Sequence, residues 1–136
     1  MQSKTIVVPG KPQGKGRPRF TRYGRPYTPE STRQYEELIR ACWMEQAGVW
    51  NLREGGVGMI VTAYFPIPAS ANKDRKSGMQ SGRILPEVKP DGDNILKIIC
   101  DALNGYAYTD DKQVVSMSIQ KRYSDDPRVE VVLYDC

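Results

Sequence analysis

Apolar residues recur with a helical period in two separate segments of the chain. In the first segment they are Tyr35, Leu38, Ile39, Cys42 and Trp43. In the second they are Ile95, Ile98, Ile99, Ala102 and Leu103. Steps of three and four residues place such side chains in one stripe along an α-helix. The pattern therefore predicts two amphipathic helices, over about residues 28–47 and 91–104.

The flanking residues suggest where these helices begin and end. Residues 28–30 offer a capping hydroxyl, a proline at the first helical position and an early acid, whereas Ser31 and Gln34 form a competing capping box. Both starts stay open. Gly48 and Gly105 are suited to follow the two helices, because glycine adopts the left-handed conformation that often ends a helix.

Four shorter segments have the residue pattern of strands. Residues 4–8 and 57–65 are rich in β-branched and aromatic side chains, and Pro66 ends the second run. Residues 113–123 alternate, with Val115, Met117 and Ile119 on one face, and residues 129–133 alternate again. A turn sequence at 124–127 predicts that the last two strands form a hairpin. The order β-α-β-α-β-β predicts an α+β domain, with two main helices packed on one small mixed sheet.

Two long stretches lack these patterns. Residues 9–29 are rich in Gly, Pro and Arg, which indicates a basic arm. Residues 67–89 are polar and predict either a mobile loop or a short helix.

Length and composition fit a single domain over residues 1–136, large enough to bury a core. Apolar runs fall short of the roughly 20 residues of a membrane-spanning helix, and residues 1–10 lack the features of a signal peptide. Three distant cysteines predict reduced thiols in a cytosolic compartment. The sequence has no histidine, which excludes catalysis by a histidine base and the usual zinc ligands.

The net charge of +4 hides a strong asymmetry. Residues 1–29 carry seven basic side chains and no acid, whereas residues 30–136 carry 13 basic and 16 acidic side chains. A basic arm on a mildly acidic body predicts a polyanionic partner.

A cluster of carboxylates surrounds the second helix. Asp91 and Asp93 lie at its start, Asp110 and Asp111 shortly after its end, and Lys97 lies one turn past Asp93. In an extended start, alternate side chains point the same way, so the first two carboxylates can converge. Converging carboxylates repel one another unless a cation neutralises them, and Mg²⁺ prefers such oxygen ligands. The cluster therefore suggests a metal site, with Lys97 placed to balance charge on a phosphate.

Each residue also has an ordinary structural explanation. Asp91 and Asp93 could cap a helix, Asp110 and Asp111 could lie in a solvated turn, and Lys97 could form a surface ion pair. The residues alone leave both explanations open.

The extended motif is more specific. Lys-Pro-Asp-Gly-Asp-Asn-x-x-Lys-x-x-x-Asp-Ala-Leu-Asn-Gly, followed by Asp-Asp-x-Gln-Val, runs over residues 89–114 and resembles the RusA family of Holliday junction resolvases. Gly-Lys-Gly-Arg-Pro-Arg at 14–19 and Tyr-Thr-Pro at 27–29 also resemble that family. The resemblance implies a homodimeric endonuclease that cleaves four-way DNA junctions in recombination and repair. It implies Mg²⁺ as cofactor, with Mn²⁺ as a substitute, and a bacterial, cytoplasmic protein of cellular or phage origin.

The family's functional residues map onto this chain one by one. Asp91, Asp93 and Asp111 match its metal ligands, and Lys97 matches its catalytic lysine. Asn94, Asp101 and Asp110 are assigned supporting roles beside them. The expected DNA contacts are Lys11, Lys15, Arg17, Arg19, Arg22, Arg25 and Lys89, interleaved in the arm with aromatic residues that can stack on unpaired bases. A non-catalytic junction-binding protein and a less selective nuclease of flaps or other branched DNA are the alternatives.

Overall fold

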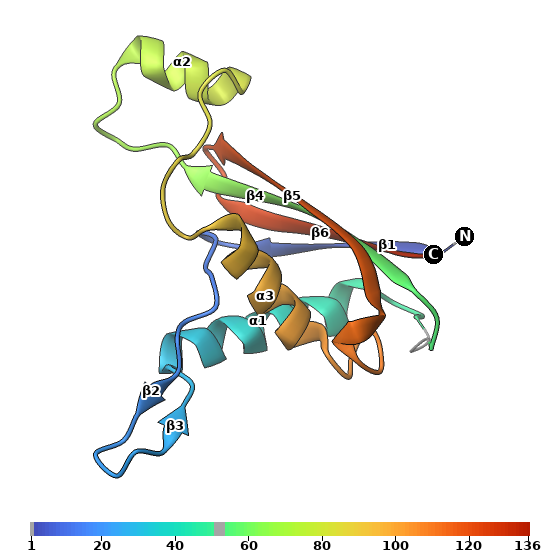
Figure 1. The fold of residues 1–136 in the computed structure, drawn as a ribbon. Helices are drawn as coiled ribbons and strands as arrows, with labels where there is room; N and C mark the ends of the chain where they lie inside the picture. The colour runs from blue at the N-terminus through green and yellow to red at the C-terminus, as the bar shows by residue number, and fades with distance from the viewer. Residues whose placement is uncertain (1, 51–53) are drawn as a thin grey trace.

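A computed structural model describes residues 2–50 and 54–136 of the chain (Figure 1). The strands are β1 (Ser3–Pro9), β2 (Arg19–Phe20), β3 (Pro26–Tyr27), β4 (Val57–Pro66), β5 (Val114–Ser124) and β6 (Arg128–Asp135). The helices are α1 (Glu30–Gln46), α2 (Lys73–Ser81), α3 (Gly92–Leu103) and a short 3-10 turn, η1 (Asp111–Gln113). The main elements follow the predicted β-α-β-α-β-β order, and the α+β fold class is confirmed.

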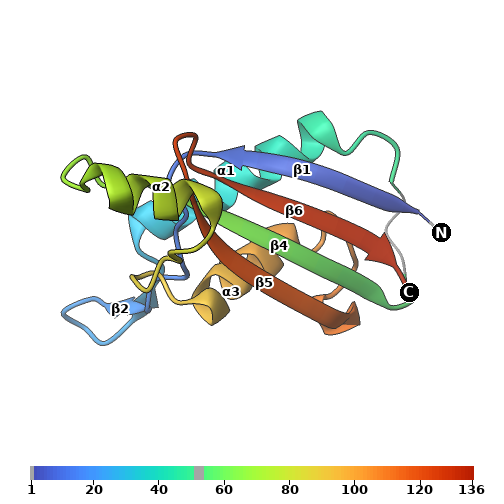
Figure 2. The same cartoon turned by 90° about the horizontal axis from the view of Figure 1, so that it is seen from above.

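One mixed sheet forms the centre of the fold, in the order β1-β6-β4-β5 (Figure 2). Strand β6 is antiparallel to both β1 and β4, whereas β4 and β5 run parallel. Helices α1 and α3 lie together on one face of this sheet (Figure 1). Alternate residues of β4 point toward these helices, and Val57, Met59, Val61 and Ala63 are 0% exposed. The core thus lies between one sheet face and the apolar stripes of two helices.

The predicted hairpin of the last two strands is wrong. Strand β4 lies between β5 and β6 and pairs with both. The turn at residues 125–127 therefore crosses the end of β4, a distance that three extended residues can span at about 10 Å. A turn sequence does not reveal what it crosses, and β4 is the strand whose inward residues are fully buried, so it gains most from two partners.

The edge position of β5 also changes which of its residues are covered. Its register with β4 shifts at Val57 and Gly58, which pair with Val114 and Ser116, so Val115 is an extra residue. Val115 is 65% exposed and does not share a buried face with Ile119, contrary to the simple alternation. A bulge of this kind is invisible to a two-residue period.

The remaining elements refine the predicted boundaries. Pro29 is the N-cap of α1 and no side chain caps it, so neither predicted capping arrangement forms. Gly48 and Gly105 follow α1 and α3 with φ of 65° and 83°, as predicted. The arm contains the β2–β3 hairpin, and the polar stretch contains α2. The three cysteines form no disulfide, as expected. Within residues 2–50 and 54–136, no helix has the length and apolar character needed to cross a membrane.

Candidate active site

Three segments that carry candidate residues lie at the same edge of the sheet. Because β1, β4 and β5 all run in one direction, they all end at what we call the carboxyl edge of the sheet. The arm follows β1 there, the α2 segment follows β4, and α3 begins after that segment (Figures 1 and 2). Most of the residues singled out in the sequence lie on these three segments.

Asp91 occupies the N-cap position of α3 but does not act as a side-chain cap. Its backbone is extended, with φ −67° and ψ 151°, and its carbonyl accepts the N–H of Ile95. Its carboxylate makes no capping hydrogen bond, so the ordinary explanation of this residue does not hold. Asp93 lies in the first turn, and both residues are exposed. The start of α3 therefore presents carboxylates that the helix does not use for capping.

Asp110 and Asp111 differ sharply although they are neighbours. Asp110 caps η1: its carboxylate accepts the N–H of Lys112 at 2.9 Å, and the Gln113 side chain accepts the N–H of Asp110 at 3.0 Å. The hydrogen bond from the N–H of Lys112 holds the pKa of the Asp110 carboxyl below its usual range. Asp111 has no such role. Burial raises the pKa of its carboxyl, and the charges of Asp110 and Asp101 raise it further, while Lys97 opposes them.

A chain of charges connects Asp111 to the interior of the molecule. Lys97 lies 3.9 Å from Asp101, one turn further along α3, as expected for an ion pair. The Asp101 carboxylate also forms an ion pair with the ammonium of Lys15, at 3.0 Å. The same ammonium lies 3.0 Å from the carboxylate of Glu36 on α1. Lys15 was predicted as a DNA contact, but its ammonium forms ion pairs with two carboxylates of the protein itself. Glu36 is the residue that the sequence pattern missed, although it shares the buried face of α1 with Tyr35 and Ile39.

The structure does not bring the three predicted metal ligands together. Asp91 and Asp93 lie at the start of α3, whereas Asp111 interacts electrostatically with Lys97 and Asp101, which lie about one and two turns further along the helix. In residues 2–50 and 54–136, no group of three His, Cys, Asp or Glu side chains is arranged to hold a metal ion. The chemistry of the donors fits Mg²⁺, because all three are carboxylates. The three-aspartate site remains a prediction.

The first half of the basic arm is docked against the helices. The N–H of Lys15 donates to the carbonyl of Asn94 at 3.0 Å, and the N–H of Gly16 donates to the Thr32 hydroxyl at 3.2 Å. A Cβ at Gly14 would lie 2.9 Å from the Cβ atoms of both Asn94 and Pro90. Only glycine allows the arm to approach the start of α3 so closely.

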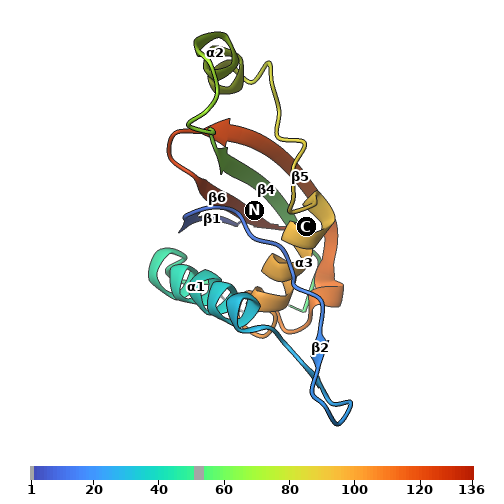
Figure 3. The ribbon, with the colours of Figure 1, turned by 90° about the vertical axis from the view of Figure 1, so that its left-hand side faces the viewer.

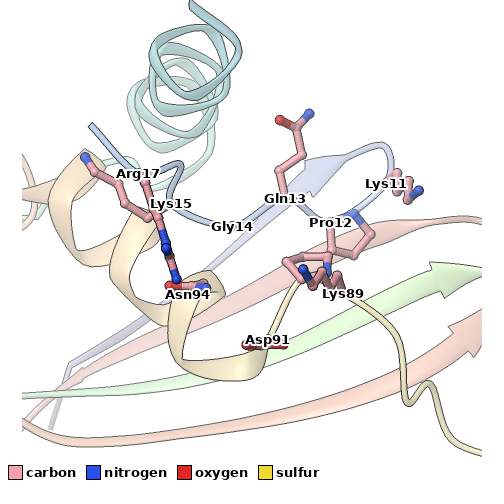
Figure 4. Close-up of a pocket in the computed structure, with 10 residues that line it drawn as sticks. Lys11, Pro12, Gln13, Gly14, Lys15, Arg17, Lys89, Asp91 and Asn94 are labelled. Carbon is pink, nitrogen blue, oxygen red and sulfur yellow. The ribbon is translucent and has the colours of Figure 1, made fainter. Parts of the chain in front are cut away.

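This docking encloses a cationic concavity of about 740 Å³ beside Asp91 (Figure 4). Lys11 and Arg17 line it from the arm, and Lys89 and Asp91 line it from the segment before α3. The cations that line the concavity suit phosphate groups.

The second half of the arm projects from the body as the β2–β3 hairpin (Figures 1 and 3). It carries the exposed Arg19, Arg22 and Arg25. Its aromatic side chains are also exposed: Phe20 by 67% and Tyr23 by 83%. Exposed large aromatic residues on a basic projection indicate a surface that meets a partner.

Comparison with known proteins assigns the chain to a family. Residues 9–134 match the sequence profile of the family described as Endodeoxyribonuclease RusA. The chain is also 37% identical over 133 residues to the uncharacterized protein YqaN of Bacillus subtilis (strain 168), covering 94% of this chain and 93% of that protein. The match spans the docked arm, α3 and η1, which carry the residues described above. The chain belongs to the RusA family of endodeoxyribonucleases.

Proposed function

We propose that this nuclease resolves four-way DNA junctions by paired hydrolysis of phosphodiester bonds, with Mg²⁺ as its cofactor. One observation carries the proposal beyond the family assignment. The start of α3 presents the uncapped carboxylate of Asp91 at the wall of a concavity lined by Lys11, Arg17 and Lys89. Carboxylates for a hard cation thus lie directly beside cations for a phosphate backbone.

Asp91, Asp93 and Asp111 are the proposed metal ligands, and Mn²⁺ is the expected substitute for Mg²⁺. When bound, such an ion polarises a phosphodiester and lowers the pKa of water. In the described residues these three carboxylates do not form one metal-binding group, so the proposal includes a closer approach of Asp111 to the start of α3, where the three would hold the ion together. The separate role of Asp110 as a cap supports Asp111 as the ligand of the pair.

Lys97 is proposed to stabilise the negative charge that develops on the phosphate during hydrolysis. It is 62% exposed and lies 3.9 Å from Asp101, so it is oriented by that carboxylate and is still accessible. Asp101 is shared between Lys97 and the ammonium of Lys15, which lies 3.0 Å from the same carboxylate. Asn94 contributes through its carbonyl, which holds the arm.

The arm is proposed to hold the DNA. Lys11, Arg17 and Lys89 would bind phosphates in the concavity, and Arg19, Arg22 and Arg25 would bind them along the hairpin. Phe20 and Tyr23 are available to stack on bases that are unpaired at a branch point. Lys15 mainly fixes the position of the arm. Its side chain is 20% exposed, so only a small part of it is available for the proposed contact with DNA.

Resolution of a junction requires cuts in two strands, so we propose that the chain acts as a homodimer with two related sites. Sedimentation of the protein alone and with a junction measures this directly. A monomer in both conditions would contradict it.

The deciding experiment incubates a synthetic four-way junction with the protein and Mg²⁺. The wild type should release paired, nicked duplex products, and Asp91→Asn, Asp93→Asn and Asp111→Asn should bind the junction without cutting it. Asp110→Asn is the matched control and should still cleave. Cleavage by all three variants would reject the site. Binding without metal-dependent products would indicate a non-catalytic junction-binding protein, and equal cleavage of flaps would indicate a less selective nuclease.

A further inference from the structure

Helix α2 carries positive charge that has no role in the function proposed above. Residues 72–83 hold four basic side chains and one acid, Asp74. The basic side chains are exposed: Lys73, Arg75, Lys76 and Arg83. None of them forms an ion pair with a carboxylate in residues 2–50 and 54–136. Uncompensated cations gathered on a short helix repel one another, which favours an anionic partner.

Specific contacts nevertheless hold α2 in place. Asn72 caps it by accepting the N–H of Arg75 at 2.9 Å, and Gly82 ends it in the left-handed conformation. Met79 is 2% exposed and is its main apolar anchor. A polar helix of nine residues is not stable alone, so the fold maintains this cationic surface through a few defined contacts.

Two glycines allow Arg83 and a further arginine, Arg122, to lie close to the helix. A Cβ at Gly78 would lie 2.6 Å from the guanidinium of Arg83, and a Cβ at Gly82 would lie 3.0 Å from that of Arg122 on β5. Beside Gly82, the end of β5 and α2 enclose a concavity of about 270 Å³ that Arg122, Ser81 and Gln80 line. These donors and the small volume suit a phosphate group.

The position of α2 relates it to the candidate site. Figure 3 faces the carboxyl edge and shows α2 on one side of the start of α3 and the β2–β3 hairpin on the other. The segment between α2 and α3 also carries Lys89, which lines the concavity beside Asp91. Cationic surfaces therefore flank the candidate site on both sides.

We propose that α2 and the end of β5 form a second phosphate-binding surface, which holds a duplex arm of the branched DNA substrate. The proposal rests on the proposed function and extends it from the cleaved strand to an arm beyond the branch point. Helix α2 is about 14 Å long, and duplex DNA presents roughly eight phosphate charges over that length. Several of the exposed cations can therefore meet phosphates of one arm at the same time.

Arg75→Gln/Lys76→Gln tests the surface, because both side chains are exposed and neither anchors α2. Binding is measured by fluorescence anisotropy in EDTA, on four-way junctions with arms of about 10 and about 20 base pairs, one and two helical turns. On the long-armed junction the variant should bind roughly 10-fold more weakly near 0.15 M salt, with a salt slope lower by about 2. On the short-armed junction the loss should be smaller.

Two further variants control the experiment. Lys4→Gln/Arg40→Gln removes two charges that lie away from the carboxyl edge, and it should bind as the wild type does. Lys4 is near the start of β1, and Arg40 stacks on Tyr106, which follows α3. Arg122→Gln probes the concavity with a single change and should weaken long-armed binding about 3-fold. Circular dichroism confirms that each variant is folded.

Wild-type affinity and salt slope in Arg75→Gln/Lys76→Gln would overturn the proposal, and so would equal losses on both junctions or an equal loss in the control. The proposed function fails separately. If the wild type does not cleave junctions with Mg²⁺ but the α2 variant still binds the long-armed junction more weakly, the DNA-binding surface is supported and the catalytic proposal is wrong. If the wild type cleaves and α2 has no effect on binding, only the surface falls.

Discussion

At the scale of single residues, the neighbours Asp110 and Asp111 have opposite relations to the fold. Asp110 is stabilised as a carboxylate by a backbone N–H, so its charge favours the folded state. Asp111 is a carboxylate whose pKa is raised by burial and by the acids around it, so its charge opposes the folded state at neutral pH. A residue kept against stability is a candidate for function.

Asp111→Asn should therefore abolish cleavage without lowering stability at pH 7. The raised pKa means that the folded protein favours the protonated form, so stability linked to Asp111 is lost as pH rises through that pKa. Removing the charge should leave Tm at pH 7 unchanged or slightly higher. Asp110→Ala should do the reverse, lowering Tm by a few degrees while retaining cleavage. Thermal melts and a junction cleavage assay measure both, and a large loss of stability in Asp111→Asn would contradict the assignment.

Lys15 should prove to be a stabilising residue. Lys15→Met leaves Glu36, whose side chain is 10% exposed, without its cation, and should cost about 1–3 kcal/mol of unfolding free energy. Lys15→Met/Glu36→Gln should recover part of that loss, since no unpaired charge remains buried. Denaturant titrations give these values. An equal loss in the single and double variants would show that the ion pair is not the cause.

The same ion pairs predict a pH limit. Burial alone would lower the pKa of Lys15, but its bonds to Glu36 and Asp101 outweigh that effect and raise the pKa above the usual 10.5. Its stabilising contribution is therefore complete below about pH 10.5 and is lost as pH rises through the higher folded value. The free energy of unfolding of the wild type should therefore fall as the pH rises above about 10.5, and that of Lys15→Met should fall less over the same range.

At the scale of elements, the arm divides into a docked half and a free half. Residues 14–16 pack on α1 and α3, whereas β2 and β3 pair only with each other. The position of the hairpin therefore depends on a few contacts at its base. The sequence showed that this segment is basic but could not show that it is anchored, because the contacts come from residues distant in the chain.

Gly14→Ala should disturb that anchor. The new Cβ would lie 2.9 Å from the Cβ atoms of Asn94 and Pro90, closer than carbon atoms can pack, so the arm must shift away from α3. We expect junction binding to weaken about 10-fold, with a fall in Tm of only a few degrees, because the core is untouched. Gly55→Ala is the matched control, since its Cβ would meet nothing within 4 Å. Equal binding by both variants would argue against a fixed arm.

Local patterns predicted the elements well, and their neighbours less well. The periodicity of residues 95–103 placed α3 within a residue or two, because one amphipathic stripe requires one face. The partner of β5 was not predictable in the same way, since a strand's pattern records which face is buried and not which strand lies beside it. The candidate site was likewise predictable in its residues but not in their arrangement in space. The motif selected Asp91, Asp93 and Asp111, but their separation along α3 depends on how the chain folds back after residue 104.

At the scale of the whole molecule, the carboxyl edge collects charges that suit DNA. The arm, the start of α3 and α2 all lie there (Figure 3). The body as a whole is acidic, so it should orient the molecule with this edge toward a polyanion.

Replacing residues 19–27 with a short Gly-Ser linker should separate binding from folding. The hairpin makes no strand pairing with the body, so Tm should stay within about 2 °C of the wild type. Junction affinity should fall, and the salt slope should decrease by about 3, one for each of Arg19, Arg22 and Arg25. Anisotropy titrations over a range of salt test this. An unchanged slope would show that the hairpin does not reach the phosphates.

The pairing of β1 with β6 has a practical consequence for handling this enzyme. Asp135 donates its N–H to the carbonyl of Gln2 at 3.0 Å, so the two ends of the described chain lie side by side, away from the hairpin and α2 (Figures 1 and 2). A dye or surface tether at either end would sit behind the molecule as it meets DNA. Single tethered molecules should therefore display the carboxyl edge freely, so that the capture of individual junctions can be watched in real time.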